Sequence, residues 1–98
     1  MKTNVEQIKE TLDQNMKLLR DKYGVKQLGV FGSVSRGENI ETSDIDLLVE
    51  FSKPIGLFKF IELEEYLGEL LGNKVDLVTK DALKPAIKED VLREVIYV

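Results

Sequence analysis

The alternation of β-type and helical patterns constrains the fold of this chain more than any other feature. Short runs of apolar and β-branched residues, typical of strands, are separated by segments with apolar residues at helical spacing. The expected strands are Val25–Phe31, Asp44–Phe51, Lys74–Thr79 and Val95–Val98. The expected helices are Val5–Tyr23, Leu57–Leu71 and a segment that begins near Pro85. The order α-β-β-α-β-α-β predicts a small α/β sheet with helices packed against it.

Local signals indicate where the helices begin and end. The first helical segment carries one apolar stripe in steps of three or four residues: Val5, Ile8, Leu12, Met16, Leu19 and Tyr23. Thr3 or Asn4 can cap its start, and Gly24 stands where a left-handed residue would end it. Pro85 suits the first turn of the last helix, because that position needs no backbone N–H. No linker or repeat interrupts the pattern, so one domain is expected over residues 1–98.

Composition excludes several kinds of chemistry. The chain has 98 residues with no cysteine and no histidine, which excludes a zinc finger, a thiol nucleophile and an imidazole base. Its net charge of −4 argues against strong, independent binding to nucleic acid. No apolar run approaches the roughly 20 residues of a transmembrane helix, and no signal peptide pattern precedes the first helix. A cytoplasmic location without membrane association is therefore expected.

Two carboxylates stand on the clearest of the expected strands. Asp44 and Asp46 are two residues apart, so their side chains point to the same face while the residues between them point to the core. No lysine or arginine lies between residues 38 and 50 to balance this charge. Because oxygen ligands and unbalanced negative charge suit a hard divalent cation, the pair is a candidate metal site. The alternative is that Asp-x-Asp simply lies on a solvent-exposed strand face.

A glycine-serine turn and a third carboxylate could complete such a site. Gly32-Ser33 follows a strand, so free backbone N–H groups there can face an anion, although an ordinary strand-to-helix turn is the alternative. Asp76 interrupts an apolar run and needs a partner or an exposed face. If its strand pairs beside that of Asp44 and Asp46, three carboxylates can hold two Mg²⁺ ions. Otherwise Asp76 is an exposed edge residue.

Taken together, these pieces resemble the minimal nucleotidyltransferase family. The resemblance rests on the segments GSVSRG (32–37), SDIDLLV (43–49) and VDLV (75–78), and it covers nearly the whole chain. It implies the nucleotidyltransferase fold of the DNA polymerase beta-like superfamily, a mixed sheet with helices packed against it. Members often have alanine at the position of Ser35, which is a mild departure.

The resemblance also implies roles for single residues. The catalytic residues and Mg²⁺ ligands would be Asp44, Asp46 and Asp76. Gly32 and Ser33 would hold the triphosphate of ATP, and Arg36 would contact phosphate or brace the loop.

For function, the resemblance implies an antitoxin that transfers AMP from ATP to a tyrosine of a HEPN-type toxin. The chain has no room for the acceptor-binding domains of larger members, so a partner protein and a homo- or hetero-oligomer are expected. Two alternatives stay open. One is a binding module that neutralises a toxin by contact, and the other is a nucleotidyltransferase that acts on a small molecule or a nucleic acid end.

Overall fold

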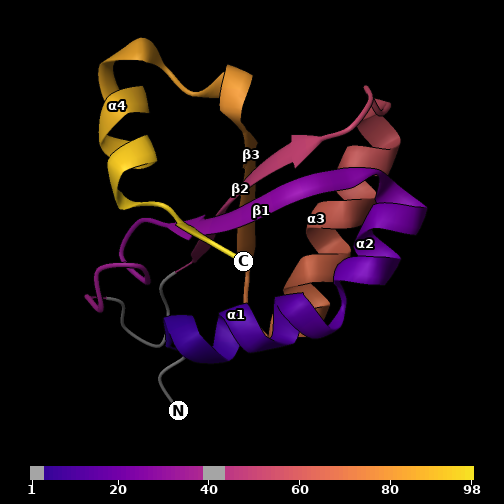
Figure 1. Cartoon of the computed structure of the whole chain (residues 1–98), viewed down its shortest axis with the longest axis horizontal. Coiled ribbons are helices and arrows are strands. Elements are labelled where there is room, and N and C mark those ends of the chain that lie inside the picture. Colours follow the sequence, from indigo (N-terminus) through magenta and orange to yellow (C-terminus); the bar gives the residue numbers. More distant parts are fainter. Residues whose placement is uncertain (1–3, 39–43) are drawn as a thin grey trace.

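The computed structural model describes residues 4–38 and 44–98 and shows a four-stranded sheet with helices on both sides (Figure 1). The strands are β1 (Val25–Phe31), β2 (Ile45–Phe51), β3 (Val75–Thr79) and β4 (Ile96–Tyr97). The helices are α1 (Val5–Gln14), α2 (Met16–Tyr23), α3 (Leu57–Leu71) and α4 (Pro85–Glu94), with a 3-10 turn, η1, at Lys80–Ala82. The predicted α/β class is confirmed, except that two helices replace the first one.

The sheet is mixed, with the strand order β3-β2-β1-β4. β1 runs antiparallel to both β2 and β4, whereas β2 and β3 are parallel. Parallel neighbours cannot be joined by a tight turn, and α3 provides the crossover between them. This crossover makes β2 and β3 begin at the same end of the sheet.

The prediction of one helix from Val5 to Tyr23 is wrong, because the helix breaks at Asn15. The side-chain amide of Asn15 donates a 2.8 Å hydrogen bond to the carbonyl of Thr11, and its backbone N–H donates to Leu12. The side chain thereby competes with the backbone for a helical carbonyl. α2 ends at Gly24 in the left-handed conformation, as predicted.

Asn4 caps α1, since its side-chain oxygen accepts a 2.9 Å hydrogen bond from the backbone N–H of Gln7. The other expected cap, Thr3, lies outside the described residues. None of the helices in the described ranges is long and apolar enough to cross a membrane.

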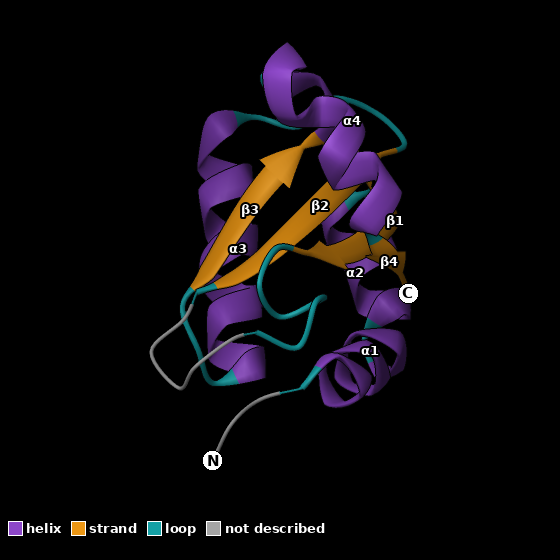
Figure 2. Ribbon diagram, turned by 90° about the vertical axis from the view of Figure 1, so that its left-hand side faces the viewer, coloured by secondary structure: helices purple, strands orange, loops and turns teal. Residues whose placement is uncertain are grey.

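Two hydrophobic clusters cover the two faces of the sheet. The larger lies against α1, α2 and α3, and β2 contributes Ile45, Leu47 and Val49 to it. The smaller lies under α4, where Leu48 of β2 meets Val91. Figure 2 shows α4 on one side of the sheet, near one end of β2 and β3, and α3 on the other. Polar side chains, Asp46 and Asp76, lie on the α4 face at the N-terminal ends of β2 and β3.

β3 is the outer edge of the sheet on one side. The backbone N–H of Leu77 in this strand donates a 2.9 Å hydrogen bond to the carboxylate of Glu64 in α3. A side chain of the neighbouring helix therefore satisfies an N–H that would otherwise face outward from the edge.

Candidate active site

Two carboxylates from distant parts of the sequence stand on the same face of the sheet, and a third lies at the start of the same strand. Asp46 of β2 lies directly opposite Asp76 of β3 in the parallel register. Asp44 immediately precedes β2, and its charge acts on Asp46. Asp44 and Asp76 are exposed and Asp46 is half-buried. The pairing of β3 with β2 thus brings Asp76 to the sequence-predicted pair.

The carboxylate of Asp46 lies in an unfavourable electrostatic environment. Burial raises its pKa above the ordinary value, and the negative charges of Asp76 and Asp44 raise it further. The guanidinium of Arg36 acts in the opposite direction, but its influence is smaller. Ionisation of Asp46 is therefore disfavoured by its burial and by the like charges beside it, and a divalent cation would relieve that repulsion.

The side chains do not form a closed metal cage. Within residues 4–38 and 44–98, no set of three acidic side chains is already close enough together to hold a metal ion. Coulombic influence reaches farther than the Mg–O distance of about 2.1 Å, so carboxylates can shift one another's pKa without sharing an ion. Instead of the expected convergence of three carboxylates on one point, Asp46 and Asp76 share a face of the sheet and Asp44 lies next to β2. Their oxygen donors fit Mg²⁺, which takes few protein ligands and keeps several waters.

The Gly32-Ser33 turn lies directly against this face. Phe31, at the end of β1, pairs with Asp46 in the antiparallel register, so the turn begins beside that carboxylate. Gly32 has a φ of +78°, and a Cβ at this position would overlap the Asp46 carboxylate. Both the backbone conformation and the space therefore require glycine here.

The turn is held by its own hydrogen bonds. The hydroxyl of Ser35 donates to the carbonyl of Gly32 at 2.7 Å, and the backbone N–H of Glu38 donates to the carbonyl of Ser33 at 2.9 Å. In the described part of the chain, neither the N–H nor the hydroxyl of Ser33 has a hydrogen-bond partner. Ser35 therefore shapes the turn, and Ser33 keeps two donors that can face an anion.

A residue that the sequence did not indicate, Glu94, also belongs to this region. Its carboxylate accepts a 3.0 Å hydrogen bond from the N–H of Gly32 and a 2.8 Å hydrogen bond from the guanidinium of Arg36. Arg36 makes a second ion pair, of 3.1 Å, with Glu38. These two carboxylates raise the pKa of Arg36, Glu94 more than Glu38. Arg36 is therefore anchored over the turn.

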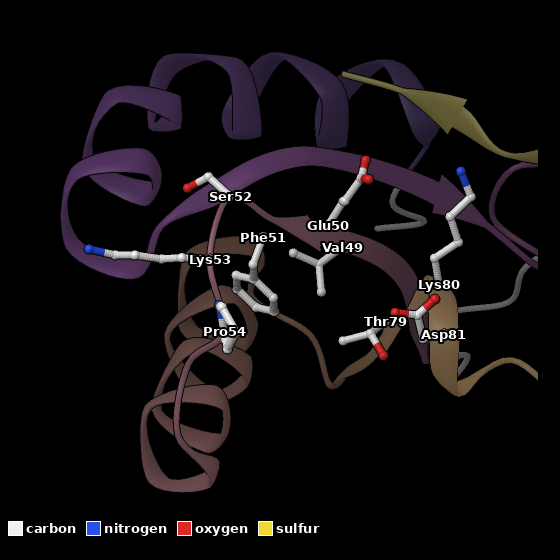
Figure 3. A pocket seen from close by; sticks show the side chains of 9 residues that line it. All are labelled: Val49, Glu50, Phe51, Ser52, Lys53, Pro54, Thr79, Lys80 and Asp81. Atoms are coloured by element: carbon white, nitrogen blue, oxygen red, sulfur yellow. The ribbon is translucent and has the colours of Figure 1, made fainter.

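A separate pocket of about 430 Å³ lies at the C-terminal ends of β2 and β3, away from the carboxylates. Figure 3 shows Val49 and Phe51 in its centre, with the charged side chains of Glu50, Lys53 and Lys80 around them. None of the three carboxylates lines it. Both basic and acidic side chains line this pocket, and the Gly32-Ser33 turn is not part of it. The other end of the sheet, with the carboxylates and the turn, is therefore the better candidate for nucleotide binding.

Comparison with known proteins assigns the fold to a family. The family described as the nucleotidyltransferase domain matches residues 7–98, which include every residue of the site described above. The chain belongs to this family. This nucleotidyltransferase is therefore an enzyme by class, and its α/β sheet is the fold of that class.

Several relatives of this nucleotidyltransferase cover most of its length. The protein adenylyltransferase MntA of Thermococcus cleftensis is 54% identical over 94 residues, which are 96% of this chain and 95% of the relative. A solved structure described as a minimal nucleotidyltransferase is 38% identical with a TM-score of 0.79, and the match covers 96% and 95% of the two chains. A toxin–antitoxin complex with AMP-PNP is 28% identical with a TM-score of 0.72, over 87% of this chain and 69% of the other.

Proposed function

We propose that this nucleotidyltransferase transfers AMP from ATP to a tyrosine hydroxyl of a HEPN-type toxin in the cytoplasm, and thereby acts as an antitoxin. The observation that carries the proposal is the placement of Asp46 opposite Asp76 and against Gly32. The name of the Thermococcus cleftensis relative supports a protein acceptor. The related complex with AMP-PNP supports an adenosine triphosphate donor and a toxin partner.

The residues of the site divide into two groups in this proposal. Asp44, Asp46 and Asp76 would hold two Mg²⁺ ions, which neutralise phosphate charge and favour ionisation of an attacking hydroxyl. The N–H of Gly32 and the two donors of Ser33 bind phosphate oxygens, because the turn that carries them lies against the carboxylate of Asp46. Arg36 adds a positive charge over the turn.

The reaction needs no covalent enzyme intermediate. The acceptor oxygen forms a bond to the α-phosphorus while the bond to the bridging oxygen breaks, and pyrophosphate leaves. The acceptor's proton passes to Asp76, whose exposed carboxylate can be reached by a side chain of a second protein. The chain contributes mainly by positioning the donor and by placing charge around the transferred group.

Neutralisation by contact is a second candidate with its own supporting observation. Near the start of α3, the side chains of Leu57, Phe58 and Ile61 are 70%, 88% and 42% exposed. Exposed apolar side chains that lie together are typical of protein-binding surfaces. They lie on the helix that packs against the face opposite Asp46. A partner bound there would leave the carboxylates uncovered.

Transfer of label distinguishes the two candidates. The purified chain is incubated with Mg²⁺, a candidate HEPN partner and ATP labelled at the α-phosphate, and the partner is expected to acquire label. ATP labelled at the γ-phosphate should give none, because pyrophosphate leaves. The Asp46→Asn variant should lose about 100-fold or more in rate, whereas Glu89→Gln on the exposed side of α4 should match the native chain.

Each other result has a defined meaning. If the partner is inhibited but carries no label, neutralisation by contact becomes the favoured function. Label in a small molecule or at a nucleic acid end, with none in the partner, would assign a different acceptor. The same assay with all four nucleoside triphosphates gives the base preference.

A further inference from the structure

Glu94 occupies the place where the turn would receive a phosphate. One oxygen of its carboxylate accepts from the N–H of Gly32 at 3.0 Å, and the other accepts from the guanidinium of Arg36 at 2.8 Å. These are two of the donors that the proposed function assigns to phosphate. The Glu94 side chain is 26% exposed, so it is held at the surface of the site rather than buried beneath it.

Stabilisation of α4 does not explain this position. Glu94 is the last residue of the helix, where its negative charge faces the negative end of the helix dipole. The other acidic residues near this end, Glu89 and Asp90, are exposed and pair with Arg93 within the helix. Glu94 instead contacts the turn, at Gly32 62 positions away in the sequence and at Arg36 58 positions away. The contact with the turn is therefore the role that the structure gives to this carboxylate.

A phosphate and Glu94 cannot use the turn at the same time. The backbone N–H of Gly32 has one hydrogen to donate, and the Glu94 carboxylate already accepts it. Two anions placed on this turn would also repel each other beside Asp46 and its neighbouring carboxylates. Glu94 must withdraw before the phosphate takes its place.

We propose that Glu94 is an internal competitor for the phosphate site, which holds the turn when no nucleotide is bound and is displaced by the triphosphate. The inference rests on the proposed function, because that function assigns the turn to phosphate. The apparent affinity for a nucleotide is lowered by the fraction of molecules in which the competitor is bound. Removing the carboxylate therefore tightens nucleotide binding.

The test compares MgATP binding to the native chain and to two variants by titration calorimetry. Glu94→Gln keeps the size of the side chain but removes its charge, and Glu94→Ala removes the contact. Both variants are expected to bind MgATP about two- to fivefold more tightly, as a partly exposed ion pair of ordinary strength would predict. Glu89→Gln, on the same helix and 85% exposed at its side chain, should bind like the native chain.

A second measurement follows the turn itself. In NMR spectra of the native chain, MgATP should shift the amide resonance of Gly32, because its N–H leaves Glu94. In the Glu94→Gln variant, that resonance should already be shifted without nucleotide. Thermal unfolding of each variant shows that it is folded.

The possible failures are separable. If the native chain binds MgATP and Glu94→Gln binds it equally or more weakly, the competitor role alone is overturned. Weaker binding by the variant would make Glu94 a residue that positions the turn for phosphate. A native chain and variants that all fail to bind MgATP would overturn the assignment of the turn as well.

Discussion

At the scale of single residues, the contact between Gly32 and Asp46 joins the two halves of the site. The turn that we propose for phosphate binding begins where β1 pairs with Asp46, and the missing side chain of Gly32 leaves the space that the carboxylate fills. Each group limits the position of the other. Substitution at either residue is therefore expected to affect both metal and phosphate binding.

Gly32→Ala is expected to destabilise the fold and to abolish stabilisation by MgATP. Alanine at a φ of +78° costs about 1–2 kcal/mol, and its Cβ would additionally displace Asp46. Gly72→Ala is a matched control, because Gly72 has a φ of +66° with open space around its Cβ position. Urea unfolding with and without MgATP measures both effects. Equal losses in the two variants would show that the contact with Asp46 is unimportant.

Asp46→Asn is expected to make the nucleotide-free protein more stable while it abolishes metal-dependent binding. Since the pKa of Asp46 is raised in the folded state by burial, Asp76 and Asp44, its ionisation favours unfolding. The protonated carboxyl of Asp46 contributes to the free energy of unfolding. This contribution is fully present below the pKa of Asp46 in the unfolded chain and is lost as pH rises through its higher pKa in the folded state. The native free energy of unfolding should therefore fall over that window, and the variant's should fall less. Parallel pH profiles would contradict this.

At the scale of elements, the sequence predicts the strands and most helices because their signals are local. Alternating and helical spacings of apolar residues gave β1, β2, β3 and α3 with bounds close to those observed. The break at Asn15 was missed because the helical stripe continues through it. A hydrogen bond between the Asn15 side chain and Thr11, which no apolar pattern reports, interrupts the helix.

The same distinction applies to the site. Asp44 and Asp46 are two residues apart at the start of β2, so their proximity is readable from sequence. The position of Asp76 depends on which strands pair, and the parallel register of β2 and β3 supplied that information. Glu94 has no local motif at all. A carboxylate at the unfavourable end of a helix is the one signal that could have drawn attention to it.

At the scale of the whole molecule, MgATP should stabilise the fold through binding. A ligand present at 100 times its Kd adds about 2.7 kcal/mol to the free energy of unfolding. In a domain of this size, that corresponds to a rise in Tm of roughly 10 °C or more. Excess EDTA should reverse most of the rise, and AMP should produce little. A full rise with ATP in EDTA would show that nucleotide binding does not need the metal.

The hydrogen bond from Leu77 to Glu64 has a consequence for how another protein can approach. An exposed edge strand can pair through its backbone with a strand of another chain. In the middle of β3, however, the carboxylate of Glu64 already accepts the outward N–H of Leu77. Association of a toxin along β3 is therefore expected to depend on side-chain complementarity. Recognition of this kind can diverge between toxin–antitoxin pairs while the backbone beneath the carboxylates stays unchanged.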